Sequence, residues 1–463
     1  MHAAKSSRSQ PGGRLKGVFS ALKGRGLAAG VAVFLALGGA AGAEEDFDPL
    51  EGIERDGRIP YVERPGDLPN PERWRYIPEG RIKSGNLFER MFVTSFIAPF
   101  VGKSSDAGWG GGIGIGDIDF RNQRRREFAV MFGAYTQERQ QAYGMAWRRW
   151  LHHIDLPEGG VLQEERSFVS ARAVFSKTRT RRFFGFGADT SPADESSYTE
   201  DFLDIGFGTQ FTLPEPGSNL ILRGAVRAEL HSLSDGIVSG APNLEERYPL
   251  VFLRDEERNM GWFTAGLRYD TRDSQSNPYR GWYVGAIADA ALIQTGGDVG
   301  AVFTFSASRV FPIPGLLHRA EDYTGEENPP TDTLLLGLRS QVTAGDLPFY
   351  TLPSLGGRDS LRGFIAGRFR DRASWYGSAE YRVWVIQRGF GFSETARIER
   401  IGLAAFYGAG SVAGDFAGLF SSSVRHSYGF SVILSIERLF PFRLDFGFSN
   451  EDFLITGGAG LTF

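Results

Sequence analysis

A short loop at 356–364, with the sequence Gly-Gly-Arg-Asp-Ser-Leu-Arg-Gly-Phe, contains the side chains best suited to chemistry. Asp359 beside Ser360 could form part of a hydrolase, but a serine nucleophile needs a histidine base within reach. The chain has six histidines, and none stands in a motif that pairs it with Ser360. Arg358 and Arg362 carry planar guanidinium groups, which bind carboxylates through paired hydrogen bonds. We therefore expect a loop with a role beyond connecting two segments, with a hydrolase as the weaker alternative and no cofactor.

Two other groups resemble ligand sites. His152, His153 and Asp155 are metal-binding residue types. Adjacent residues of a strand point to opposite faces, so we interpret this group as a turn and expect no metal. The glycine-rich run at 110–116 is a weak match to a phosphate-binding loop, and it suits a flat, weakened strand better.

The segments that flank the loop alternate between apolar and polar residues. Leu334, Leu336 and Leu338 fall on one parity and Arg339 on the other, and similar alternation resumes at 373–386. A period of two residues is the signal of a β-strand. The loop is therefore expected to join two strands.

The same alternation continues from about residue 91 to the end, as in the even-numbered residues from Phe128 to Ala134. Strands are expected near 92–101, 109–119, 126–137, 142–152, 167–178, 199–212, 218–232, 259–271, 280–293, 298–311, 333–345, 373–386, 398–409, 427–438, 441–449 and 453–463. This number is even, as bacterial single-chain membrane barrels require.

Alternation alone does not separate a soluble sandwich, whose apolar faces form a dry core, from a membrane barrel, whose apolar face meets lipid. The composition favours the barrel, with 61 glycines, 38 phenylalanines, 15 tyrosines and 8 tryptophans among 463 residues. Aromatic residues form the girdles of such barrels. We predict an all-β fold: a sixteen-stranded antiparallel transmembrane β-barrel.

The first residues have the pattern of a secretory signal peptide. Basic residues precede an apolar run at 27–41, and small residues follow at 41–43. We expect a signal peptide at 1–43, with an uncleaved anchor as the alternative. A proline-rich periplasmic or lumen-plugging segment is expected at 44–90, and the barrel at 91–463. The net charge of -4 gives no support for nucleic-acid binding.

The order of the strands predicts which connections face outward. The longest connection, at 346–372, falls on the extracellular side, as does the loop at 233–258. A long, proline-rich connection at 312–332 is the exception, because the strand count places it in the periplasm.

Three motifs resemble the BamA/TamA family of outer-membrane assembly and translocation barrels. They are Asp-Ser-Leu-Arg-Gly-Phe at 359–364, Tyr-Asp-Thr-Arg-Asp at 269–273 with Pro-Tyr-Arg-Gly-Trp at 278–282, and Gly-Ser-Ala-Glu-Tyr-Arg at 377–382. The resemblance covers roughly 91–463 and is strongest after residue 260.

The resemblance implies that the surface loop folds inward and that Arg362 docks on Glu380 in the lumen. The docking motif would comprise Arg358, Asp359, Leu361, Arg362, Gly363 and Phe364. Family members have an aspartate on strand thirteen as a second acceptor, where this chain has Gly408. The docking is therefore expected to depend on Glu380 or on another acid.

The second motif implies a periplasmic turn fixed by charge-assisted hydrogen bonds. Its residues are Asp270, Arg272, Asp273, Pro278, Arg280 and Gly281. Phe463 matches the carboxy-terminal aromatic signal of outer-membrane proteins.

By resemblance, the chain is a surface-antigen-like barrel of the outer membrane and not an enzyme. It would assist the insertion or translocation of proteins, or of lipids, through a seam between its first and last strands. Its partners would be outer-membrane lipid, client β-barrel proteins and a separate periplasmic or barrel subunit, because 44–90 is too short for the family's periplasmic domains. The alternative is a passive channel, or a structural or accessory barrel partnered with another assembly complex.

Overall fold

The computed structural model describes residues 51–82, 95–104, 107–315, 325–327, 329–391, 397–436 and 440–459. The expected signal peptide at 1–43 and the terminal Phe463 lie outside the described residues, and both stay predictions.

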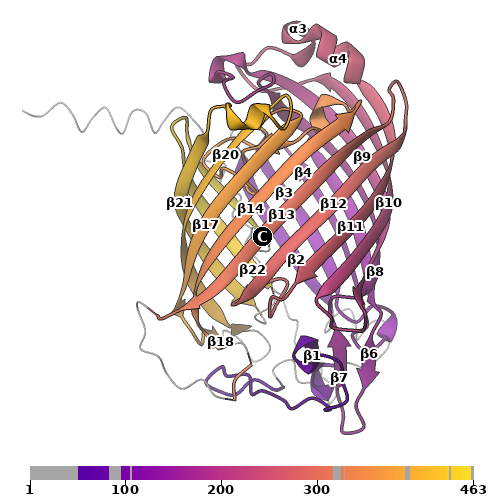
Figure 1. Ribbon diagram of the computed structural model, residues 1–463, viewed down its shortest axis with the longest axis vertical. Helices are drawn as coiled ribbons and strands as arrows, with labels where there is room; N and C mark the ends of the chain where they lie inside the picture. Colours follow the sequence, from indigo (N-terminus) through magenta and orange to yellow (C-terminus); the bar gives the residue numbers. More distant parts are fainter. Residues whose placement is uncertain are drawn as a thin grey trace, which may run out of the picture.

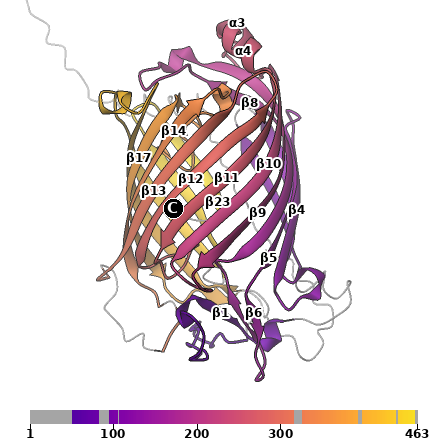
Figure 2. The ribbon, with the colours of Figure 1, turned by 45° about the vertical axis from the view of Figure 1, so that its right-hand side comes forward.

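Within the described residues, one antiparallel sheet contains sixteen strands, in which sequential strands pair side by side. Figures 1 and 2 show these strands steeply tilted around a common axis, and the inner side of the sheet is here called the lumen. The strands are β2 (Ser95–Ser104), β3 (Gly108–Asp117), β4 (Glu127–Thr136), β5 (Gln141–Trp150), β8 (Phe168–Phe183), β9 (Ser196–Leu213), β10 (Leu220–Asp235), β11 (Glu257–Asp270), β12 (Gly281–Gln294), β13 (Gly300–Ile313), β14 (Asp332–Gly345), β17 (Ala373–Ile386), β20 (Arg400–Ala413), β21 (Arg425–Ile436), β22 (Phe440–Phe448) and β23 (Phe453–Ala459). The expected all-β, antiparallel architecture is confirmed.

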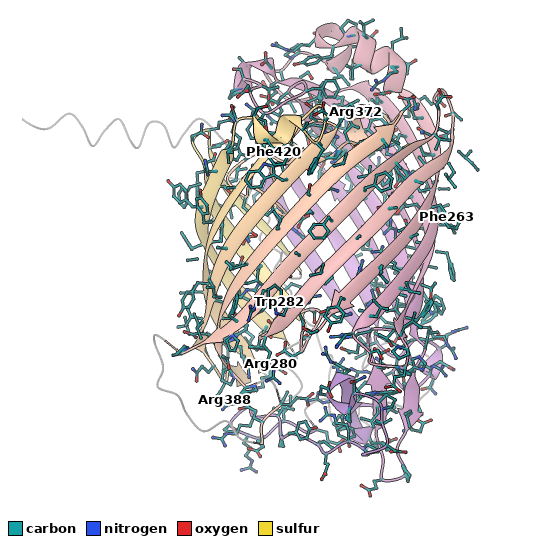
Figure 3. All side chains as sticks on the ribbon, in the orientation of Figure 1. Phe263, Arg280, Trp282, Arg372, Arg388 and Phe420 are labelled. Atoms are coloured by element: carbon teal, nitrogen blue, oxygen red, sulfur yellow. The ribbon has the colours of Figure 1, made fainter. Side chains whose placement is uncertain are left out.

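The two faces of the sheet differ in chemistry. Directly opposite residues of an antiparallel pair point to the same face, so the cross-strand register separates an outer face from an inner one. The outer face exposes large apolar side chains, including Met145, Phe207, Val226, Phe263, Phe303, Leu336, Tyr407 and Phe430. Figure 3 shows Phe263 pointing away from the barrel. The inner face carries charged pairs such as Arg172 with Asp204.

Strand β4 departs from the expected facing. Phe128 lies opposite Arg148, which lies opposite Ser170 on the inner face. The even-numbered residues from Phe128 to Ala134 therefore face the lumen, although their apolar character had suggested the outer face. That expectation was wrong because the odd-numbered positions include Ala129 and Met131, so both faces of β4 are apolar.

The barrel has two different ends. At the loop end lie α3 (Leu244–Arg247), α4 (Pro249–Asp255), η4 (Pro192–Asp194), η5 (Phe349–Thr351), η6 (Gly418–Phe420), β15 (Ser354–Leu355) and β16 (Phe369–Arg370). At the turn end lie η1 (Pro71–Arg73), η2 (Glu79–Arg81), η3 (Phe120–Asn122), β1 (Trp74–Ile77), β6 (His153–Asp155), β7 (Val161–Glu164), β18 (Phe390–Gly391) and β19 (Arg397–Ile398). In Figure 1 the loop end is at the top and the turn end at the bottom.

The described part of the proline-rich segment, residues 51–82, folds against the turn end. Strand β1 pairs with β7, and β7 pairs with β6 in a three-stranded sheet. The Tyr61 amide donates to the Gly325 carbonyl, and Arg64 pairs with Glu327 at 3.2 Å. The segment thus joins several connections between barrel strands.

The group at 152–155 is not the expected turn, because His153 begins the short strand β6. Its ring Nε2 lies 2.8 Å from the carbonyl oxygen of Arg124. The residues that the structure describes contain no group of three or more His, Cys, Asp or Glu that could hold a metal ion. They also contain no helix long and apolar enough to cross a membrane.

Candidate functional site

The connection at 346–372, here called the docking loop, is buried over much of its length. Its base is Phe349, whose ring packs on Phe183 at a centroid distance of 4.8 Å. The Phe349 amide donates to Asp255 at 2.9 Å, which ties the loop to α4. Apolar packing and a buried hydrogen bond thus fix the point where the loop leaves β14.

The motif at 356–364 forms a compact turn. Gly356 and Gly357 have φ angles of 109° and 91°, which favour glycine. The Gly356 amide donates to the Ser360 hydroxyl at 3.1 Å, and the Gly357 amide donates to the Phe364 carbonyl at 2.8 Å. Leu361 and Phe364 belong to a buried apolar cluster that includes Tyr376 of β17. These contacts hold the loop against the barrel wall and leave Arg362 to point inward.

Arg362 bridges two buried carboxylates. Its Nη2 lies 2.6 Å from Oε2 of Glu380 on β17, and its Nη1 lies 3.2 Å from Oδ1 of Asp445 on β22. The guanidinium also lies over the Phe406 ring of β20, 3.9 Å from its centroid. The side chains of all three charged residues are at most 1% exposed. One loop residue therefore joins three strands of the wall.

Two further arginines extend this group into a chain of alternating charge. Arg382 Nε lies 2.7 Å from Glu380, and Arg443 Nε lies 2.8 Å from Asp445. Three cations thus share two carboxylates, all of them buried. Removing one partner of a buried ion pair leaves an uncompensated charge at large cost, so the group specifies one position of the loop.

The structure brings Arg362 and Glu380 together and supplies an acceptor that was not foreseen. A fork on one carboxylate was expected, whereas the guanidinium spans two. Gly408 faces the lumen, and a Cβ there would lie 2.8 Å from the Tyr376 hydroxyl, so this position has no room for an acid. Asp445 supplies the second carboxylate instead. The sequence did indicate that Asp445 faces the lumen, because it alternates with the apolar, outward-facing residues of a regular strand.

Gly363 allows the closest approach between the loop and the wall. A Cβ at Gly363 would overlap the carbonyl group of Phe448 at the end of β22, and a Cβ at Gly447 would overlap the Arg362 carbonyl. The Ser449 hydroxyl donates to the Gly363 carbonyl at 2.8 Å. The loop therefore lies directly on the backbone of the penultimate strand.

A second arginine of the docking loop was also missed. Arg368 donates to both carboxylate oxygens of Glu451, at 2.6 and 2.9 Å, and to the Thr190 carbonyl at 2.7 Å. Glu451 lies in the connection between β22 and β23, and Thr190 lies between β8 and β9. This contact joins opposite parts of the loop end.

The remaining motif residues lie nearer the surface. Arg358 forms a partly exposed pair with Asp359 at 3.4 Å, and its carbonyl accepts from Arg443 at 3.4 Å. A Cβ at Gly458 of β23 would overlap the Arg358 guanidinium. The Ser360 hydroxyl accepts a hydrogen bond from the Gly356 amide and so stabilises the backbone of the turn.

The second motif forms the turn between β11 and β12. Arg272 donates from Nε and Nη2 to the two oxygens of Asp270, both at 2.9 Å. Asp273 accepts from the amides of Ser274 and Tyr279, each at 3.0 Å, and burial raises the pKa of Asp273.

The other residues of that motif complete the turn. Pro278 is buried, the exposed Arg280 is at the turn end in Figure 3, and Gly281 has a φ of 114°. Arg73 of the N-terminal segment donates to the Arg272 carbonyl, so this turn is also a docking point for 51–82.

Comparison with known proteins places this arrangement in a family. A model of the Omp85 superfamily domain matches residues 166–454. No curated protein sequence matches the chain.

Similar solved structures include BamA from Haemophilus ducreyi lacking POTRA domains 1–3, at 12% identity and a TM-score of 0.48, covering 79% of this chain and 70% of that one. CdiB from Acinetobacter baumannii has 12% identity and a TM-score of 0.47, and CdiB from Escherichia coli 11% and 0.49. Each of these matches covers 79% of this chain, which spans 58% and 61% of the two CdiB chains. The match to the domain model shows that the chain belongs to the Omp85 superfamily, as the motifs shared with the BamA/TamA family indicated.

Proposed function

We propose that this protein is an outer-membrane barrel that assists the insertion or translocation of other proteins, or of lipids, without catalysis. Its membership of the Omp85 superfamily supports this role. The apolar outer face supports a place in lipid, since membrane barrels turn such a face to the bilayer. The single observation that carries the proposal is the docking loop, which is bound to the hairpin at one end of the strand order.

The proposed route for a client is the seam between β2 and β23. These strands end the order of the sheet, and no pairing joins them among the described residues. An unpaired strand edge presents amide and carbonyl groups that can template another strand. A client strand would add to such an edge and be released into the bilayer.

The docking loop would brace the wall beside this seam. It binds β22 through Asp445 and through the close contact of Gly363 with Phe448. Among the described residues, β23 pairs with one strand, β22, in a register of seven residue pairs. The loop therefore fixes the penultimate strand, so that opening of the seam would be confined to β23 and β2.

A separate partner subunit is part of this proposal. Residues 51–82 lie against the turn end and bind connections of the barrel. A partner that guides clients would bind at this end. Co-purification from native outer membranes tests this point, and a barrel that is isolated without any stoichiometric partner would argue against it.

The experiment that tests the function is reconstitution into proteoliposomes with an unfolded client β-barrel. Folding of the client is followed by its heat-modifiable migration in gels. Wild type is expected to accelerate folding over empty liposomes, and Arg362→Ala is expected to reduce this effect. Arg309→Ala is the matched control, because Arg309 lies on the outer face, stacked on Trp282 at 4.3 Å. Equal client yields with and without the protein would refute the proposal and favour the passive or accessory barrel.

A further inference from the structure

The lumen wall opposite the docking loop carries a group of arginines with no role in the site described above. These are Arg148 on β5, Arg172 on β8, Arg223 and Arg227 on β10, and Arg268 on β11. We call this surface the arginine wall. The register shows that it faces inward: Arg172 and Arg227 both lie opposite Gly206 of β9, and Arg227 donates to Asp289 and Thr264 from the inner face.

The acids of this wall are already paired. Asp204 lies 2.5 Å from Arg172. Glu229 and Asp289 lie 2.8 and 3.0 Å from Arg227.

Among the residues that the structure describes, no carboxylate pairs with Arg148, Arg223 or Arg268. Arg148 instead lies over the Phe168 ring, 4.1 Å from its centroid. The wall therefore carries five arginines against three carboxylates, an excess of two positive charges.

Glycines on neighbouring strands lie directly beside two of these side chains. A Cβ at Gly266 would lie 3.6 Å from Arg223 Cβ, and one at Gly285 would lie 3.1 Å from Arg268 Cγ. The glycine at 285 therefore accommodates the Arg268 side chain, which a larger residue would displace.

The wall is also accessible to solvent. The Arg172 side chain is 51% exposed although it points into the lumen, and Arg148 is exposed as well. The arginines under the docking loop, by contrast, are almost fully buried. The two sides of the lumen thus hold cations in opposite environments.

We propose that the arginine wall is an anion-binding surface that makes the lumen selective for small anions such as chloride. A confined space lined by one sign of charge focuses the field and concentrates counter-ions. Rings of charged side chains select ions in membrane pores by the same means. Arg223 and Arg268 contribute most directly, because they lie on adjacent strands and neither has a carboxylate partner among the described residues.

The test uses the full chain in planar bilayers with a potassium chloride gradient. The reversal potential of the wild-type current is expected to have the sign of chloride selectivity. The double variant Arg223→Gln/Arg268→Gln should shift the reversal potential toward the value expected for a potassium-selective pore. Arg309→Gln, which removes an outward arginine, should leave it unchanged.

Several results would overturn the proposal: no current through correctly folded wild-type barrels, a current without anion preference, or an unchanged reversal potential in the double variant. Heat-modifiability of each variant shows that it folds. The inference rests on the barrel spanning a membrane and not on client assembly. A barrel with anion-selective current but no effect on client folding would support this inference and refute the proposed function.

Discussion

Arg362 of the docking loop and Asp445 of β22 face each other with Nη1 3.2 Å from Oδ1. With Glu380 on β17, Asp445 makes Arg362 a bridge between strands that are not neighbours in the sheet. The loop therefore acts as an internal cross-brace between β17 and the final hairpin. Its removal should affect the barrel near the proposed seam more than elsewhere.

The buried charge group predicts which substitution lowers the stability of the barrel more. Arg362→Gln leaves two balanced pairs, Arg382 with Glu380 and Arg443 with Asp445, so a loss of about 1–3 kcal/mol is expected. Glu380→Gln leaves three arginines with one carboxylate and should cost more, about 3–5 kcal/mol. Unfolding by urea in detergent micelles measures both. A larger loss in Arg362→Gln than in Glu380→Gln would contradict this charge balance.

Gly363→Ala should displace the docking loop without changing any charge. The added Cβ overlaps the carbonyl group of Phe448, so the loop or β22 must move. Protease cleavage within 346–372 is expected to increase. Gly414→Ala is the control, because the nearest atom to a Cβ there is an Asp371 oxygen at 4.0 Å. Equal cleavage of both variants would show that the close approach does not hold the loop.

Arg368→Lys should loosen the last hairpin. Lysine cannot reproduce the fork with both oxygens of Glu451. Hydrogen exchange of the β23 amides is expected to become faster, while exchange in β11 and β12 stays as in wild type. Uniform acceleration over the barrel would indicate general destabilisation, and unchanged exchange in β23 would show that the Arg368–Glu451 contact does not restrain the hairpin.

Acid should release the N-terminal segment from the turn end. Glu79 accepts from Arg124 at 3.0 and 2.8 Å, and this bond, followed by one from the Gly160 amide, lowers the pKa of Glu79. A lowered carboxyl pKa stabilises the docked state fully above the ordinary value of 4.5, and the effect is lost as pH falls through the lowered value. Proteolysis of 71–82, scanned from about pH 6 to 3, should rise at the acid end.

Glu79→Gln is the companion variant. Its cleavage should be higher than that of wild type near neutral pH and should vary less with acid. The same pH profile in both proteins would assign the release to another group.

The strands could be predicted from the sequence because every second residue of a barrel strand faces outward and is apolar, which produces a regular alternation. β17 was placed at 373–386, which are its observed bounds. β4 shows the limit of the method, since apolar residues occupy both of its faces. Alternation identifies a strand there but not which side faces the lumen.

The site was only partly accessible from the sequence. The motifs pointed to Arg362 and Glu380, which lie close together in the chain. Arg362 belongs to the docking loop, and Glu380 belongs to β17, the strand that follows it. Asp445 lies far along the chain, and alternation shows only that it faces inward. Which inward acid lies beneath the loop depends on the curvature of the barrel and on the tilt of its strands, and no local pattern encodes either.

The most direct test of the proposed function locks the seam. The chain contains no cysteine, so one cysteine in β2 and one in β23 form one intramolecular disulfide without competition from native thiols, and non-reducing gels separate it from intermolecular cross-links. Pairs that cross-link fully are reconstituted with an unfolded client barrel. The proposal predicts that the oxidised protein loses its acceleration of client folding and regains it on reduction. Equal acceleration by the oxidised and reduced forms would contradict insertion through this seam.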